Sequence, residues 1–154
     1  MAKFTPIIRS LAADKFNEII GASSRKSREI YFHRHGIDAP KMSSLFPRPG
    51  AKNAARATDL FARLQEVEDE ELAEEIVRTW LLSKRPMLAA ALDHLGIVHD
   101  NGLTESDDVK KFESLSVKEI RALVDKLSGV SAREDIAIYL RFMGTQKLDE
   151  ALSK

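Results

Sequence analysis

Residues 68–81, EDEELAEEIVRTWL, decide the fold class of this chain. The acidic run Glu68–Glu71 suits the positive end of a helix dipole, so it marks a helix start. Behind it, apolar side chains recur at intervals of three and four residues, which is the spacing of one helix face. That face is formed by Leu72, Ala73, Ile76, Val77, Trp80 and Leu81. The stretch therefore predicts an amphipathic helix that buries one side.

Proline and glycine mark further helices on both sides of this stretch. We expect Pro86 to open the next helix, because proline at the first helical position loses no hydrogen bond, and Gly96 to end it in a left-handed cap. Near the N-terminus, Thr5 followed by Pro6 predicts a helix whose first N–H groups are capped by the Thr5 hydroxyl. One apolar face continues from there, so a single helix is expected as far as Gly21.

The last third of the chain contains two further helix starts. The sequences at 116–119 and 131–134 both have the Ser-x-x-Glu spacing of a capping box, in which each side chain accepts from the other residue's backbone N–H. Each is followed by apolar residues at helical spacing and then by a glycine, Gly129 or Gly144. Residues 145–154 are predicted to be a short tail that frays.

These patterns predict an all-α fold, an irregular bundle of about seven or eight short helices. Signals for β-structure are confined to residues 97–103, which form at most one tiny hairpin. A chain of 154 residues corresponds to about one domain, so we expect a single helical domain over residues 1–154. It would comprise basic N-terminal helices (1–35), a proline-rich connector (36–52) and an acidic helical core (53–154).

Composition narrows the classes of function. Cysteine is absent, which excludes disulfides, thiolate nucleophiles, cysteine-ligated zinc and iron–sulfur clusters. No signal-peptide core and no run of membrane-spanning length are found in the sequence. We therefore expect a cytoplasmic protein, and no motif calls for a cofactor.

The net charge of zero conceals an asymmetry along the chain. Residues 1–56 contain 11 Lys and Arg against 4 Asp and Glu, a balance of +7, whereas residues 57–154 contain 13 against 20, a balance of −7. Such a division favours either a nucleic-acid contact or charge-complementary docking. The simpler alternative is that the two parts pack on each other within one chain.

Residues 92–108, LDHLGIVHDNGLTESDD, gather histidines, carboxylates and turn glycines between two predicted helices. His94, His99 and Asp100 are candidates for a metal or hydrolytic site, with His99 as general base because imidazole titrates near neutral pH. Their spacing does not match the HExxH pattern of zinc proteases. Turn chemistry at residues 100–102 explains the same residues without any ligand.

A basic stretch with aromatic residues begins at residue 24 and gives a nucleic-acid alternative. Cations there could neutralise phosphates, while Tyr31 or Phe32 could stack on a base. The overall pI of about 6.9 is far from that of a dedicated nucleic-acid binder. The candidate contacts are Arg25, Lys26, Arg28, Arg34, Lys41 and Arg48.

Protein contacts form the third hypothesis. The connector carries Met42, Leu45 and Phe46 between prolines, and Trp80 lies on the broad stripe quoted above. These four side chains either contact another protein or belong to the chain's own core. Since no catalytic motif is present, we expect a non-catalytic binding or assembly module that acts through protein–protein contacts, as a homodimer or with a different protein. Nucleic-acid binding and a metal or hydrolytic site are the alternatives.

Overall fold

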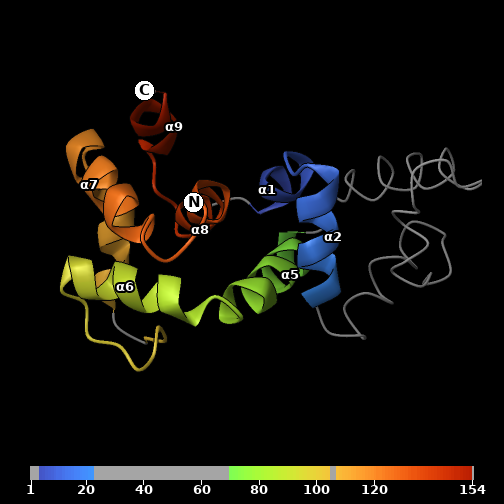
Figure 1. Ribbon diagram of the computed structural model, residues 1–154, viewed down its shortest axis with the longest axis horizontal. Helices are drawn as coiled ribbons and strands as arrows, with labels where there is room; N and C mark the ends of the chain where they lie inside the picture. The colour runs from blue at the N-terminus through green and yellow to red at the C-terminus, as the bar shows by residue number, and fades with distance from the viewer. Residues whose placement is uncertain (1–3, 23–69, 105–106, 154) are drawn as a thin grey trace, which may run out of the picture. The chain divides into compact units, whose positions relative to one another are not determined.

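The computed structural model describes residues 4–22, 70–104 and 107–153 (Figure 1). Its helices are α1 (Thr5–Arg9), α2 (Ala13–Ala22), α5 (Glu70–Leu82), α6 (Arg85–Leu95), the 3₁₀ helix η2 (Asp107–Ser114), α7 (Val117–Leu127), α8 (Arg133–Phe142) and α9 (Leu148–Leu152). Within these ranges there is no strand, so the all-α prediction is confirmed for them. None of these helices has the length and apolar composition needed to cross a membrane.

Contacts divide the chain into two units, and the boundary falls inside α5. One unit is Phe4–Trp80, and the other contains Leu81–Lys154. The part of the predicted basic N-terminal helices beyond residue 22, the connector at 36–52 and the first part of the predicted acidic core lie outside the described residues.

In the first unit, the prediction of a single helix from Thr5 to Gly21 is wrong, because two helices form. Helix α1 stops at Arg9 with Ser10 as its C-cap, and α2 begins at Ala13. The Ser10 hydroxyl donates to the carbonyl oxygen of Ile7 at 2.9 Å. Serine competes in this way for backbone groups and weakens helix interiors. The apolar periodicity runs through the break, which is why the sequence pattern did not mark it.

The predicted cap of α1 is also wrong. The N-cap residue is Phe4, and its side chain makes no capping hydrogen bond. Instead, the carboxylate of Glu70 accepts from the backbone N–H of Phe4 at 2.7 Å and from that of Thr5 at 3.4 Å. The Thr5 hydroxyl also donates to Glu70. A residue at the start of α5 therefore caps α1, and Thr5 acts as a donor.

The apolar stripe of α5 is buried, as predicted. Glu70 and Glu71 occupy its first turn, at the positive end of the helix dipole. All six stripe residues named above are at most 5% exposed.

The second unit is built around α7, which packs on α6, α8 and α9 (Figure 1). Helix α6 begins at Arg85, so Pro86 lies in its first turn but one residue later than predicted, and the predicted left-handed cap at Gly96, with φ 72°, is confirmed. Phe112 from η2 meets Tyr139 from α8 edge to face, with ring centroids 5.8 Å apart. Burial raises the pKa of the Tyr139 phenol, so this side chain stays neutral in the core.

Of the two predicted capping boxes, the first is confirmed and the second is wrong. The Ser116 hydroxyl oxygen accepts from the Glu119 N–H, and the Glu119 carboxylate accepts from the Ser116 N–H. Helix α8 instead has Ala132 as its N-cap, with no side-chain hydrogen bond. The Ser131 N–H donates to the carbonyl oxygen of Leu127, the last residue of α7, so Ser131 belongs to the turn that follows that helix. A capping box at 131–134 would need Ser131 as the N-cap, and α8 begins one residue too far along the chain for that.

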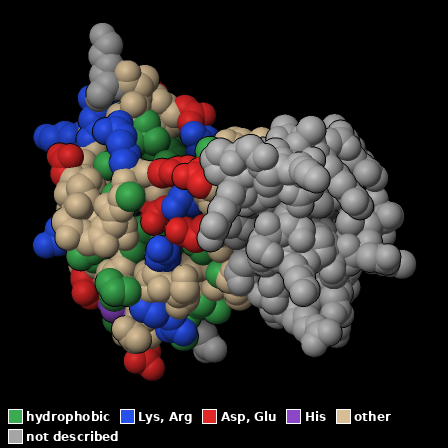
Figure 2. Space-filling view, turned by 45° about the vertical axis from the view of Figure 1, so that its right-hand side comes forward, with side chains coloured by type: hydrophobic (Ala, Val, Ile, Leu, Met, Phe, Trp, Pro, Cys, Tyr) green, Lys and Arg blue, Asp and Glu red, His purple; other side chains and the backbone are tan. Residues whose placement is uncertain are grey.

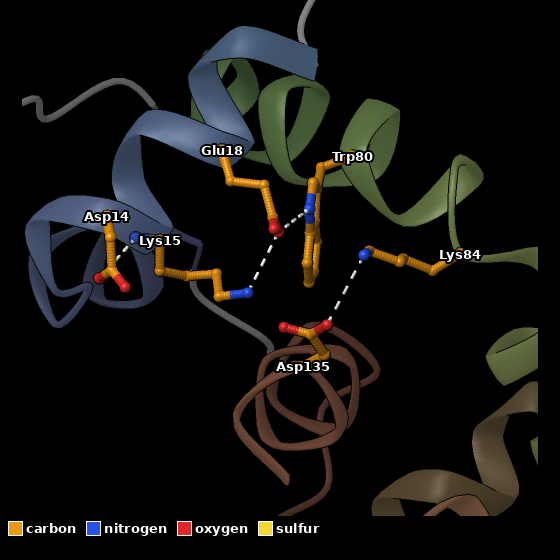
Figure 3. A network of polar contacts seen from close by, with 6 residues as sticks. All are labelled: Asp14, Lys15, Glu18, Trp80, Lys84 and Asp135. Atoms are coloured by element: carbon orange, nitrogen blue, oxygen red, sulfur yellow. Dashed lines mark hydrogen bonds and ion pairs between the residues drawn. The ribbon is translucent and has the colours of Figure 1, made fainter. Parts of the chain in front are cut away.

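Asp135, in the first turn of α8, is buried against a lysine. Its carboxylate lies 3.7 Å from Nζ of Lys84, a residue that connects α5 to α6 (Figure 3). The Asp135 side chain is only 9% exposed. Since a buried carboxylate needs a partner, this lysine offsets part of its desolvation.

The prediction that residues 145–154 fray is wrong for α9. Leu148 and Ala151 are buried, and this apolar contact offsets the cost of ordering the segment. Two arginines bind the last carbonyl oxygens of the helix: Arg121 Nε donates to Ala151 and Arg133 donates to Leu152, both at 3.2 Å. Such contacts satisfy carbonyls that a helix end leaves unpaired.

Candidate functional site

The segment between α6 and η2 contains a tight turn at Asp100–Leu103. Asn101 and Gly102 both have positive φ, 50° and 88°, as a type I′ turn requires. Asp100 and Leu103 exchange two backbone hydrogen bonds, 2.7 and 3.0 Å long. The predicted turn is confirmed, and its pairing is a single β-bridge without flanking strands.

The ring of His99 connects this turn to helix α6. The Gly102 N–H donates to Nδ1 of His99 at 3.0 Å, so the neutral ring carries its proton on Nε2. Nε2 lies 2.7 Å from the Asp93 carboxylate and donates to it. The His99 side chain is 11% exposed, whereas that of Asp93 is 74% exposed. Both ring nitrogens are therefore engaged within the chain.

Gly102 brings the turn into direct contact with α6. A Cβ atom at this position would lie 2.8 Å from Leu88 Cβ and 3.2 Å from the backbone nitrogen of Ala89. From the same helix, Arg85 donates to the carbonyl oxygen of Asn101 at 3.3 Å. Only glycine fits this close approach.

Two large apolar side chains of this segment are exposed. Val98 is 84% exposed and Leu103 is 44% exposed. The Thr104 hydroxyl donates to the Val98 carbonyl at 2.8 Å, so the two ends of the segment are also tied together. We call residues 98–103 the apolar turn.

Only one of the three predicted metal or hydrolytic residues lines the open groove beside α6. His94 is exposed and lines an open groove of about 390 Å³ together with Lys111 and Glu119. Neither His99 nor Asp100 lines that groove. Across the described ranges, no three His, Asp or Glu side chains come close enough to hold a metal ion. In this arrangement, the two nitrogens of His99 hold the turn, and a catalytic base would need one of them free.

Glu119, which also lines that groove, forms part of the N-terminal cap of α7. Its pKa is lowered from the ordinary 4.5, first by the backbone N–H of Ser116 and then by the Ser116 side chain. The carboxylate is thus held in its charged form as part of the α7 cap.

Of the predicted protein contacts, only Trp80 lies within the described residues. It is 1% exposed, inside the unit Phe4–Trp80. Its indole N–H donates to Glu18 at 2.7 Å, and the same carboxylate oxygen lies 3.1 Å from Lys15 Nζ (Figure 3). That ammonium is also 5.6 Å from the centre of the indole ring. Trp80 therefore belongs to the chain's own core in this structure.

The remaining predicted contacts lie outside the described residues. They are Met42, Leu45 and Phe46 for protein, and Arg25, Lys26, Arg28, Arg34, Lys41 and Arg48 for nucleic acid. On the face shown in Figure 2, the described part of the surface carries interspersed basic and acidic side chains. The apolar turn was not among the predicted contacts, although the Asn-Gly pair at 101–102, with Val98 before it and Leu103 after it, is visible in the sequence.

Comparison with protein families, with curated proteins and with solved structures found no match to this chain.

Proposed function

We propose that this protein is a non-catalytic helical assembly module that binds a second copy of itself through the apolar turn. The observation that carries the proposal is the exposure of Val98, 84%, on a segment fastened to α6 at several points. Removing such an aliphatic side chain from water contributes about 1.5–3 kcal/mol. Because the turn is already ordered, little conformational entropy is lost when it binds.

The charge distribution supports a second copy as the partner. With 24 basic and 24 acidic residues, two copies do not repel each other through net charge. The +7 segment at residues 1–56 and the −7 segment at residues 57–154 are complementary between copies. A stable dimer buries about 800 Å² on each partner, so the apolar turn would form the centre of a larger interface.

We also propose that the protein works in the reducing cytoplasm. The absence of cysteine supports this location. It also means that copies assemble through non-covalent contacts alone.

Sedimentation velocity over a range of concentrations tests the proposal. The wild-type protein should show a reversible monomer–dimer equilibrium, and Val98→Ser should weaken it by about tenfold or more, since 1.4 kcal/mol corresponds to a factor of ten. Val130→Ser is the matched control, because Val130 is also an exposed valine, at 51%, but lies between α7 and α8. A wild-type protein that stays monomeric at every concentration, or equal effects of the two substitutions, would refute self-association through the turn.

A further inference from the structure

A second feature lies in the unit that contains Leu81–Lys154, where α7, the start of α8 and the end of α9 meet. An open cavity of about 220 Å³ is found there. This is smaller than the pockets that hold drug-sized molecules, so its size suits a ligand of few atoms. Its lining comprises Arg121, Val124, Asp125, Arg133, Ala151 and Leu152.

The two arginines of this cavity have unused donors. Arg121 uses Nε to bind the Ala151 carbonyl, and Arg133 uses one terminal nitrogen to bind the Leu152 carbonyl. In the part of the chain that the structure describes, neither side chain has a further hydrogen bond or ion pair. A guanidinium group has five N–H donors in a fixed plane. Each arginine is therefore held in place by α9 while most of its donors are available.

The rest of the lining limits what those donors can bind. Paired guanidinium groups match the planar, two-oxygen geometry of a carboxylate. Asp125 adds one negative charge to the same wall, which disfavours a dianion such as phosphate and offers an acceptor to a ligand N–H or O–H. Val124 and the α9 side chains supply apolar surface for a short hydrocarbon part.

We propose that this cavity binds a small carboxylate that also carries an ammonium or hydroxyl group, as in an α-amino or α-hydroxy acid. The carboxylate would face Arg121 and Arg133, and the donor group would face Asp125. The site is separate from the apolar turn, and its existence does not depend on self-association.

The test uses four probes of similar size and NMR amide spectra of the full chain at constant ionic strength. L-alanine and L-lactate carry both groups, propionate carries only the carboxylate, and propylamine carries only the ammonium. We expect saturable shifts at the cavity residues with alanine and lactate, about tenfold weaker binding of propionate, and no saturable binding of propylamine. Inorganic phosphate is the fifth probe and should bind more weakly than alanine.

Substitutions then test which side chain binds which group of the ligand. Asp125→Asn should abolish the preference for alanine over propionate while propionate still binds. Arg133→Lys should weaken every carboxylate by about tenfold, since a lysine lacks the planar fork. Arg141→Lys is the matched control, because Arg141 pairs with Asp149 and does not line the cavity.

Three results would overturn the proposal. The first is the absence of saturable shifts with any of the carboxylates on wild-type protein, which needs no variant and so does not depend on how well a variant folds. The second is tighter binding of phosphate than of alanine. The third is equal affinity of the Arg133→Lys and Arg141→Lys variants for alanine.

Discussion

Gly102 shows how closely the apolar turn is fitted to α6. An alanine there would combine a φ of 88° with a contact of 2.8 Å to Leu88 Cβ. Strain in the left-handed region and overpacking each cost about 1–3 kcal/mol, so Gly102→Ala should lower the free energy of unfolding by about 3 kcal/mol. Gly96→Ala is the control, because Gly96 has φ 72° with nothing near its would-be Cβ, and should cost about 1 kcal/mol. Urea denaturation measures both, and equal losses would contradict the close contact.

At Thr145 we expect the opposite effect, because replacing its hydroxyl group should stabilise the fold. Among the described residues, its buried hydroxyl oxygen has no hydrogen-bond partner, and the residue is 7% exposed. An unsatisfied buried hydroxyl carries a desolvation cost, so Thr145→Val should raise the free energy of unfolding by about 1 kcal/mol. Thr145→Ser keeps the hydroxyl and loses a methyl group, and should lower it. Chemical denaturation of the two variants measures both changes. A Thr145→Val variant less stable than the wild-type protein would mean that the hydroxyl has a hydrogen-bond partner.

Glu119 makes the cap of α7 depend on pH. Because its pKa in the folded state is lowered from 4.5, its contribution is present above that value and is lost as pH falls through the lower folded value. Glu119→Gln keeps an acceptor that does not titrate. The wild-type protein should therefore melt at a higher temperature than this variant near pH 7, and the gap should close near pH 3. Thermal melts at both pH values check this, and a constant gap would exclude the carboxylate as the cause.

At the scale of elements, Glu70 links two helices that are far apart in sequence. Its carboxylate caps α1 across 66 residues. Loss of a cap costs about 1–2 kcal/mol, so Glu70→Ala should destabilise the protein by that amount and expose the amides of α1 to hydrogen exchange. Glu71→Ala removes the neighbouring charge of the same turn and should leave α1 protected. Equal exchange in the two variants would show that α1 does not depend on this contact.

The same distinction between local and distant contacts explains which elements the sequence could predict. Local signals mark the first turn of α5, both ends of α6 and the start of α7: Glu70 and Glu71, Pro86 and Gly96, and the Ser116–Glu119 box. The cap of α1 and the order of α9 depend on partners that no local pattern contains. For α9 these are Arg121 and Arg133, which are 30 and 19 residues away from the carbonyls they bind.

The candidate site was predictable to a similar extent. The Asn-Gly pair predicted the turn, because few other residues adopt positive φ. The partners of His99 could not be predicted, since they depend on where α6 ends relative to the turn. The histidine proposed as a base from its titration range alone is, in the structure, bonded through both nitrogens.

For the molecule as a whole, the proposed property is assembly with a second copy of the chain. Its surface and sequence combine zero net charge with an exposed valine that the fold holds in place. Neither feature alone requires a partner, because single exposed apolar residues are common on monomers. Their combination on an ordered turn is what favours a contact between copies.

The most direct test is intermolecular paramagnetic broadening. Since the chain has no cysteine, Asp100→Cys introduces one unique position for a nitroxide label on the exposed turn. This labelled protein would be mixed with ¹⁵N-enriched wild-type protein, so that any broadening arises between copies. The amide signals of Val98 and Leu103 should broaden most, and those near Val130 should stay sharp. Broadening that is absent, or spread evenly over the surface, would contradict self-association through the apolar turn.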